Sequence, residues 1–288
     1  MMKLADRKGN IEENDSLQDR FLAWMYGHVT GRLLLKPLVC PKVSELGGKL
    51  LSTGISRLAV KPFVRANHID LSQCEKQTFS SYNDFFTRKL KQDARPVEPE
   101  LNRMPAPCDS RLSVYEIQEN QSFEIKHTRY TVASLLKNHK LAAAYAGGYA
   151  WVFRLCVDDY HRYMYVDDGV TSSNYHIPGV FHTVNPVAND CYPIYKENTR
   201  EYSLLRSENF GTVLMMEVGA LMVGKIENHH GAGSVKRGQE KGNFAFGGST
   251  IILLTQAKTV YPDRDIIKNS RHGVETRVRM GEGVGSRK

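Results

Sequence analysis

The sequence predicts an α+β fold in which N-terminal amphipathic helices pack on a β-rich core. Near the N-terminus apolar residues recur at helical spacing, whereas beyond about residue 107 short apolar runs alternate with Gly and Pro, as strands do. The chain has 288 residues, which is enough to bury a sizeable core. We therefore expect a helical region over residues 1–75 and a β-rich core over residues 76–288.

The N-terminal third is expected to hold two helices. Residues 1–14 are polar, and we expect them to be loose. Ser16 is typical of a helix cap. The helix after it is predicted by one apolar stripe, made of Leu17, Phe21, Trp24, Met25, Val29 and Leu33. A second stripe between Leu50 and Ala59 predicts another helix, which Pro62 closes.

The remaining chain is expected to be mostly strands. Residues 79–96 predict a helix that ends before Pro96, and a Pro-rich stretch over 95–107 links it to the core. Strands are predicted at 112–117, 123–126, 149–155, 176–181, 212–218 and 221–226. One helix interrupts them at 131–140, and the Gly-rich tail from residue 281 is expected to be mobile.

Charge and cysteine content narrow the function classes. The formal net charge of +8 suits an anionic partner, either a membrane surface or nucleic acid. No nucleic-acid-binding motif is present, so we expect no nucleic acid. No apolar run approaches the ~18–20 residues of a membrane span, and the N-terminus lacks a signal-peptide core. Five scattered cysteines without a Cys-x-x-Cys pair predict a reducing compartment.

Two features of the side chains have more than one interpretation. The N-terminal helices either pack on the core or place Trp24 and neighbouring leucines in a lipid interface, with basic residues at the headgroups. His229-His230 resembles a metal pair, but no third ligand has suitable spacing, and we expect no metal.

The segment Gly247-Gly248-Ser249-Thr250 precedes an apolar run that starts at Ile251. The hydroxyl of Ser249 can reach the carbonyl of Gly248, which has no side chain to obstruct the attack. An N→O acyl shift followed by β-elimination and hydrolysis would leave a pyruvoyl group, which is an electron sink for amines. The alternative is an ordinary turn before a strand, and so short a motif does not decide between them.

Several motifs occur together with this segment. They are Phe79–Leu90, Pro105-Ala-Pro-Cys-Asp109, Asp159-Tyr-His161-Arg162, His176–Pro186 and Glu217–Ile226. In this order, over about residues 20–286, they resemble the phosphatidylserine decarboxylase family. The double glycine of the Ser249 segment is similar to the branch called type II.

The resemblance implies an activity and its partners. The chain would cleave itself between Gly248 and Ser249 into residues 1–248 and 249–288, which stay associated. Ser249 would become a covalent pyruvoyl group, the pyruvate cofactor, for decarboxylating phosphatidylserine to phosphatidylethanolamine and CO2. A diacyl substrate implies a peripheral protein on the cytoplasmic face of the cell membrane. The oligomeric state is left open, with a homodimer as one option.

The resemblance also implies residue roles. Asp109 and a histidine would activate the Ser249 hydroxyl, since serine alone is a weak nucleophile. Many relatives carry His-Arg-x-His, but Met164 stands at the second histidine here, and a thioether cannot take a proton. Either His161 serves both maturation and turnover, or a histidine of the next block, His182 or His176, fills the gap. Asp159 would share a strand face with His161 and tune it.

Two other functions are also compatible with the sequence. The same pyruvoyl chemistry could decarboxylate a soluble amino acid such as tryptophan, although the amphipathic N-terminus favours lipid. An unprocessed lipid-binding homologue is the second rival, and Met164 is the observation that supports it.

Overall fold

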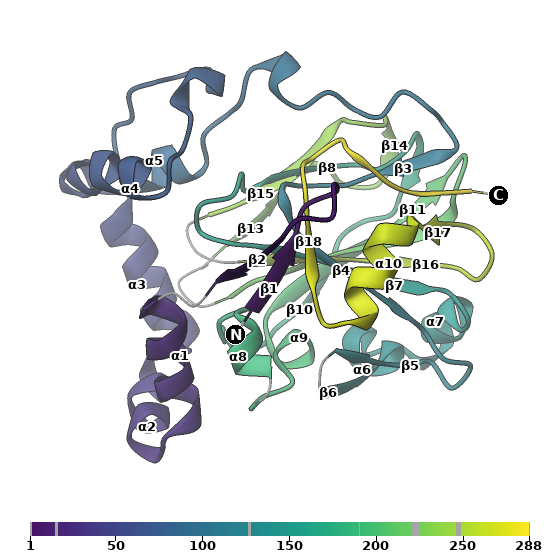
Figure 1. The fold of residues 1–288 in the computed structure, drawn as a ribbon, viewed down its shortest axis with the longest axis horizontal. Helices are drawn as coiled ribbons and strands as arrows, with labels where there is room; N and C mark the ends of the chain where they lie inside the picture. The colour runs from purple at the N-terminus through teal and green to yellow at the C-terminus, as the bar shows by residue number, and fades with distance from the viewer. Residues whose placement is uncertain are drawn as a thin grey trace.

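The computed structural model describes residues 2–14, 17–125, 128–189, 191–220, 225–245 and 249–287. Within them, a mixed α+β fold is built on an 11-stranded sheet in the order β14-β9-β11-β12-β16-β7-β4-β18-β1-β2, with β10 also paired to β11 (Figure 1). Its strands are β1 (Met2–Ala5), β2 (Ile11–Asn14), β4 (Ser110–Glu116), β7 (Tyr149–Leu155), β9 (Gly169–Thr171), β10 (Tyr175–Ile177), β11 (Arg200–Ser207), β12 (Gly211–Val218), β14 (Gly233–Val235), β16 (Ser249–Thr255) and β18 (Glu275–Val278).

Smaller sheets and short helices surround this sheet. The smaller sheets are β13 (Ile226–Asn228), β15 (Glu240–Phe244) and β8 (Arg162–Met164); β17 (Tyr261–Pro262), β19 (Gly283–Ser286) and β3 (Arg103–Pro105); and β5 (Ser122–Ile125) with β6 (Thr128–Thr131). The helices are α1 (Leu17–Gly27), α2 (Val29–Leu38), α3 (Pro41–Leu51), α4 (Val60–Ala66), α5 (Tyr82–Phe86), α6 (Val132–Leu136), α7 (His139–Ala142), α8 (Pro186–Asn189), α9 (Ile194–Glu197) and α10 (Arg264–Arg271).

Strand β16 lies in the middle of the large sheet, between β12 and β7, and all of its residues are buried. Ile251 faces Glu217 of β12 and Phe153 of β7 in antiparallel register. A continuous apolar run is the pattern expected of a strand that is buried on both faces. The strands predicted at 149–155 and 212–218 are the two neighbours of β16, and both predictions are confirmed.

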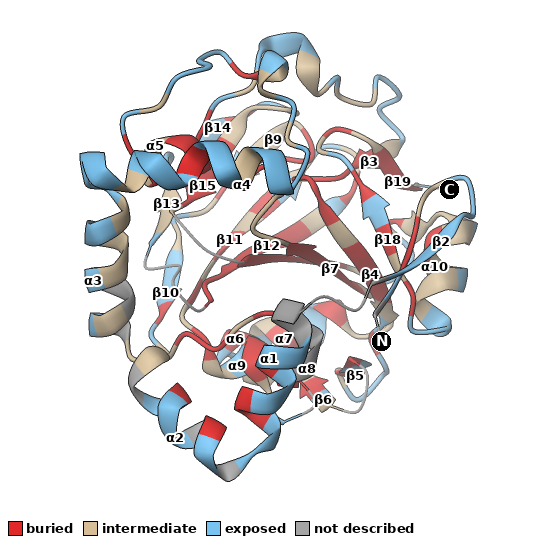
Figure 2. Ribbon diagram, turned by 60° about the vertical axis from the view of Figure 1, so that its left-hand side comes forward, coloured by how far each residue is buried: buried red, intermediate tan, exposed pale blue. Residues whose placement is uncertain are grey.

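The N-terminal helices α1, α2 and α3 stand at one side of the molecule and leave much of their surface exposed (Figures 1 and 2). The first apolar stripe was expected to form one helix through Leu33, but the chain turns between α1 and α2. At Gly31 a Cβ atom would lie 2.6 Å from the Cα of Met25, so this close approach needs glycine. The helix cap predicted at Ser16 lies outside the described residues.

The expectation that residues 1–14 are loose is wrong, because the described part forms the β1–β2 hairpin. Asp6 closes its turn by accepting hydrogen bonds from the backbone N–H groups of Lys8 and Asn10, at 2.8 and 2.9 Å. Gly9 supplies a left-handed φ of 92°. Strand β1 then pairs in parallel with β18, where Leu4 faces Glu275, so the polar segment is stabilised by a strand near the other end of the chain.

The helix predicted over 79–96 is confirmed only for Tyr82–Phe86, which form α5, and the prediction is wrong for the residues after Phe86. The carbonyls of Thr87 and Arg88 turn to the guanidinium of Arg162, whose Nε lies 3.0 and 3.2 Å from them. Residues 89–91 exchange backbone hydrogen bonds with residues 73–75, and Gln92–Ala94 then form a single 3₁₀ turn. Tertiary hydrogen bonds therefore override local helix propensity here.

Three further boundaries differ from expectation. The 131–140 helix is interrupted where Lys137 adopts φ 49°, after which Asn138 caps α7. Pro62 does not end a helix but lies in the first turn of α4, where a missing N–H is tolerated. The predicted strand at 176–181 stops at Ile177 because Pro178 cannot donate to a ladder.

The glycine-rich tail is ordered rather than mobile. It forms β19, which lies between β17 and β3. A Cβ atom on Gly285 would lie 2.7 Å from the Trp151 ring, so glycine lets the strand pack against the core. Of the strand predicted at 221–226, residues 221–224 lie outside the described residues.

The burial of β16 yields a stability prediction. Ile252→Ala should lower the free energy of unfolding by about 2–5 kcal/mol, since it removes buried methylenes and leaves a cavity. Val170→Ala, at a side chain of β9 that is half exposed, should change it by less than about 0.5 kcal/mol. Urea denaturation followed by tryptophan fluorescence measures both, and equal small effects would contradict the central position of β16.

Candidate active site

Three segments that are distant in sequence meet at one edge of the large sheet. Asp109 directly precedes β4, residues 156–161 follow β7, and Ser249 begins β16. Strand β7 lies between the other two, with Arg154 facing Arg111 and Leu155 facing Ser249. This register brings the start of β4, the end of β7 and the start of β16 side by side.

Ser249 is fully buried, and its Oγ has no hydrogen-bond partner among the described residues. A buried hydroxyl without a partner is energetically unfavourable, so it calls for an explanation beyond packing. A side chain that is to be converted into another group does not need a lasting partner, so this environment fits the origin of a pyruvoyl group. The preceding residue, Gly248, lies outside the described residues.

The carboxylate of Asp109 is held from two sides. The Arg95 Nε donates to its two oxygens at 2.8 and 3.0 Å, and the Arg95 Nη2 also donates to Oδ2. The backbone N–H of Met280 donates to Oδ1 at 2.8 Å. Arg95 is itself fixed by Gln73 and the carbonyl of Ala94. Asp109 is therefore a buried, oriented carboxylate at the sheet edge.

His161 is fully buried, and its ring packs on Phe86 with 4.0 Å between the centroids. Its Nδ1 lies 3.0 Å from the backbone oxygen of Asp159. Because a carbonyl oxygen only accepts, Nδ1 must carry the proton, and in the neutral ring Nε2 is the basic nitrogen. The carbonyl of His161 accepts from the N–H of Phe244, which ties the histidine to the strand that leads toward Ser249.

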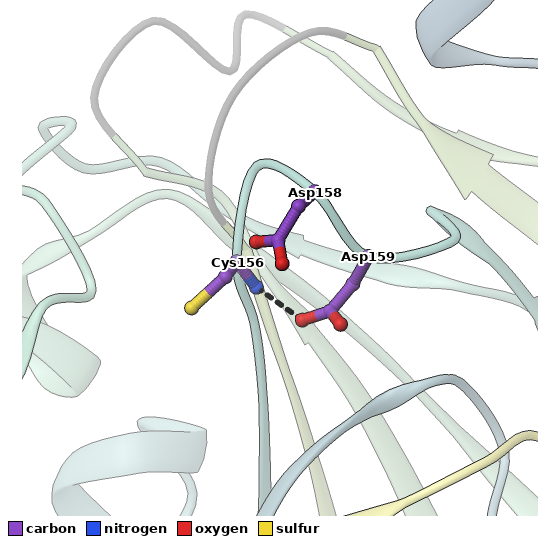
Figure 3. Close-up of side chains that lie close together, drawn as sticks. All are labelled: Cys156, Asp158 and Asp159. Atoms are coloured by element: carbon purple, nitrogen blue, oxygen red, sulfur yellow. Dashed lines mark hydrogen bonds between the residues drawn. The ribbon is translucent and has the colours of Figure 1, made fainter. Parts of the chain in front are cut away.

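The expectation for Asp159 needs correction. Residues 156–161 form a turn, not an extended strand, so Asp159 and His161 do not share a strand face. The carboxylate of Asp159 bends back to accept the N–H of Cys156 at 2.7 Å (Figure 3). The backbone oxygen of Asp159 lies 3.0 Å from the Nδ1 of His161. Burial, reinforced by the neighbouring charge of Asp158, raises the pKa of Asp159 to about 8.

A cavity of about 250 Å³ opens beside this edge and is lined by both Asp109 and Asp159. Four arginines line the same cavity; they are Arg88, Arg95, Arg277 and Arg279. Cys156, Asp158 and Asp159 bring one thiol and two carboxyl groups within 4.8 Å of one another (Figure 3). With a pKa of about 8, Asp159 is mostly protonated at neutral pH.

The other two histidines have different surroundings. The His182 ring stacks on Tyr192 with 4.7 Å between centroids, and its Nδ1 lies 3.3 Å from the Tyr26 hydroxyl of α1. Burial lowers the pKa of His182. His176 is exposed on β10, with its Nδ1 3.2 Å from Glu201. The structure thus gathers Asp109, Asp159, His161 and Ser249 at one sheet edge, and a catalytic role for either other histidine stays a prediction.

Met164 lies at the end of β8 and is buried. Its N–H donates to the carbonyl of Pro107 at 3.0 Å, so it lies against the segment that carries Asp109. A thioether cannot take a proton, so Met164 adds no base to this edge, whereas His68 and Tyr160 line the cavity beside Asp109 and Asp159.

Sequence reasoning missed several residues around the site. Arg95 and Met280 are separated from Asp109 by 14 and 171 positions, and no local spacing signals either contact. A buried ion pair joins Glu217 to Lys241 at 2.9 Å, on the face of the sheet that Ser249 also occupies. A glutamate inside an otherwise apolar strand was the available signal for this pair.

The raised pKa of Asp159 predicts a pH dependence. The folded protein holds this proton up to about pH 8, whereas the unfolded chain releases it near 3.8. Asp159 therefore makes the free energy of unfolding fall as the pH rises from 4 to 8. Asp159→Asn removes this contribution, so its stability relative to wild type should be higher at pH 8 than at pH 5. Urea denaturation at both pH values measures this, and a constant difference would contradict the assignment.

Comparison with known proteins agrees with this geometry. The family model for phosphatidylserine decarboxylase matches residues 82–286. The phosphatidylserine decarboxylase proenzyme 2 of Clostridium acetobutylicum is 43% identical over 265 residues, which cover 92% of this chain and 91% of that protein. Phosphatidylserine decarboxylase proenzymes of Clostridium botulinum and Clostridium perfringens are 37% and 36% identical over the full length of both chains. The chain belongs to the phosphatidylserine decarboxylase family.

Proposed function

We propose that the chain is a proenzyme that cleaves itself between Gly248 and Ser249 and then decarboxylates phosphatidylserine to phosphatidylethanolamine and CO2. The observation that carries the proposal is the buried Ser249 hydroxyl without a hydrogen-bond partner among the described residues, next to the loop of His161. The family matches favour a phospholipid over a soluble amino acid such as tryptophan, because the relatives are named for the phospholipid reaction.

Self-cleavage uses the residues at the sheet edge. The Ser249 hydroxyl attacks the Gly248 carbonyl carbon, and its proton passes to a base, for which the Nε2 of His161 is our candidate. The peptide bond becomes an ester, and removal of the Ser249 Cα proton then breaks the Cβ–O bond and frees the Gly248 carboxylate. Hydrolysis of the remaining dehydroalanine releases ammonia and leaves the pyruvoyl group.

Decarboxylation of the substrate would use the same residues again. The pyruvoyl carbonyl supplies the electron sink for loss of CO2 from a substrate that carries an amine. His161 would then donate a proton to the substrate α-carbon, and its packing on Phe86 excludes water from one ring face. Asp109, which Arg95 fixes at the same sheet edge, is our candidate for the carboxylate that supports this histidine. Because Met164 cannot titrate, we assign maturation and turnover to one histidine.

The two products of cleavage are expected to stay together. Residues after Ser249 supply β16 between β12 and β7, β18 between β4 and β1, and the β17–β19 pair beside β3. The side chains of β16 are buried, and each large one stabilises the assembly by about 1.5–3 kcal/mol.

Within the region over residues 1–75, the helices that begin at Leu17 form the membrane-docking surface that we propose, without the β1–β2 hairpin. Large apolar side chains there are more than half exposed; they are Phe21, Leu33, Leu34, Leu46, Leu50, Ile55 and Leu58. Lys36, Lys42, Lys49 and Arg57 are also exposed on this region, as expected of a surface that meets anionic headgroups. In the described part of the chain no helix meets the length and hydropathy of a membrane span.

The cysteines support a proposal for the side of the membrane. All five are unpaired, from Cys40 to Cys191, and one of them is exposed. Unpaired, exposed thiols suit a reducing compartment, so we place docking on the cytoplasmic face of the cell membrane.

Ser249→Ala should abolish both self-cleavage and decarboxylation, because it removes the nucleophile and the source of the pyruvoyl group. We expect less than about 0.1% of wild-type phosphatidylethanolamine formation from phosphatidylserine vesicles, the loss expected when a catalytic nucleophile is removed. Ser203→Ala is the matched control, since Ser203 is also a buried hydroxyl without a partner among the described residues, on β11. Equal activity of the two variants would reject the proposal.

Membrane docking predicts a separate effect. The double variant Leu33→Asp/Leu34→Asp should reduce co-sedimentation with phosphatidylserine-containing vesicles by about tenfold or more, since two leucines lose contact with lipid. Val170→Asp places one such charge on an exposed apolar site of β9 and should leave binding unchanged. If all these proteins pellet equally with vesicles, the helices are not the docking surface.

A further inference from the structure

The N-terminal hairpin covers a strand from the other end of the chain. Strand β1 pairs in parallel with β18, with Leu4 facing Glu275 and Ala5 facing Thr276. Leu4 and Ala5 are 8% and 0% exposed, so the side chains of β1 are buried against the rest of the protein. Without β1, strand β18 would be the edge of the large sheet. In Figure 1 the purple hairpin and the yellow C-terminal segment lie side by side.

Arg7, in the turn of the hairpin, makes the strongest contacts of this region. Its guanidinium donates to Asp265 through Nε at 2.7 Å, to Asp263 through Nη2 at 2.7 Å, and to the carbonyl of Gly283 through Nη1 at 2.8 Å. Glu282 lies 3.5 Å from Nη1. All of these acceptors follow Ser249 in the sequence. Burial opposes the charge of Arg7, but the surrounding carboxylates outweigh burial and raise its pKa.

The segment that Arg7 holds also reaches the candidate active site. Strand β18 pairs with β4, so that Val278 faces Ser110. Two residues beyond Val278, the N–H of Met280 donates to the carboxylate of Asp109. The position of β18 therefore determines whether this amide meets Asp109.

We propose that the hairpin of residues 2–14 is a clamp that keeps the C-terminal segment seated and so holds the Met280 amide on Asp109. The clamp matters most once Gly248–Ser249 is cleaved, and that part rests on the proposed function. Before cleavage the segment is tethered covalently, which gives its contacts a high effective concentration. After cleavage the segment is held by non-covalent contacts, to which the hairpin adds a strand pairing and the Arg7 ion pairs.

The test compares Arg7→Ala with Lys8→Ala in the full-length protein. Lys8 is the next residue of the same turn, and its exposed side chain forms no ion pair among the described residues. Hydrogen–deuterium exchange of residues 274–287 should become about tenfold faster in Arg7→Ala, because hydrogen bonds to charged groups are lost, and should be unchanged in Lys8→Ala. Arg7→Lys should recover part of the protection.

A second measurement addresses retention. Size-exclusion chromatography in increasing urea should release the 249–288 fragment at a lower concentration from Arg7→Ala than from wild type or Lys8→Ala. If exchange and release are the same in Arg7→Ala and Lys8→Ala, the clamp is rejected even when cleavage is normal. If denaturing gels show no cleavage in wild type, the proposed self-cleavage fails, while the exchange experiment still decides whether the hairpin holds the segment.

Discussion

Strand β16 runs through the middle of the large sheet, and its first residue is Ser249. Its hydrogen bonds to β12 and β7 fix the Ser249 backbone, and its buried side chains join the core. A chain that breaks its own backbone immediately before such a strand must fold first. A free segment would have to insert between β12 and β7, which are its neighbours on either side. The position of β16 therefore links folding, proposed maturation and the cohesion of the two proposed products.

The same constraint organises the groups around Ser249. Asp109 at the start of β4 and the loop after β7 are placed by strands that flank β16 directly or through one neighbour. Arginines neutralise the carboxylates that gather there: Arg95 binds Asp109, and Arg154 binds Glu275. One carboxyl group, Asp159, is not neutralised in this way and keeps its proton to about pH 8. The sheet edge thus combines a fixed anion, a basic imidazole nitrogen and a neutral acid.

Residues with a local signal could be predicted from the sequence. The apolar runs of β7, β12 and β16 predict buried strands, and the ordered motifs identify the family and the candidates Asp109, His161 and Ser249. Contacts between distant segments had no such signal. The β1–β2 hairpin is polar and depends on β18, Arg95 and Met280 converge on Asp109 only in the folded chain, and the residues after α5 leave the helix because Arg162 binds their carbonyls. The turn of residues 156–161 also had no signal in the sequence. It forms because the Asp159 carboxylate accepts the backbone N–H of Cys156.

The central claim, that one chain ends at Gly248 and a second begins at Ser249 as a modified residue, is tested most directly by intact-mass spectrometry of the purified protein. The account predicts a large chain that ends at Gly248 with a free carboxylate and a small chain of residues 249–288. The small chain should be lighter than the serine-initiated peptide by one ammonia and should carry no reactive N-terminal amine. A single uncleaved chain, or a small chain that begins with unmodified serine, would contradict it.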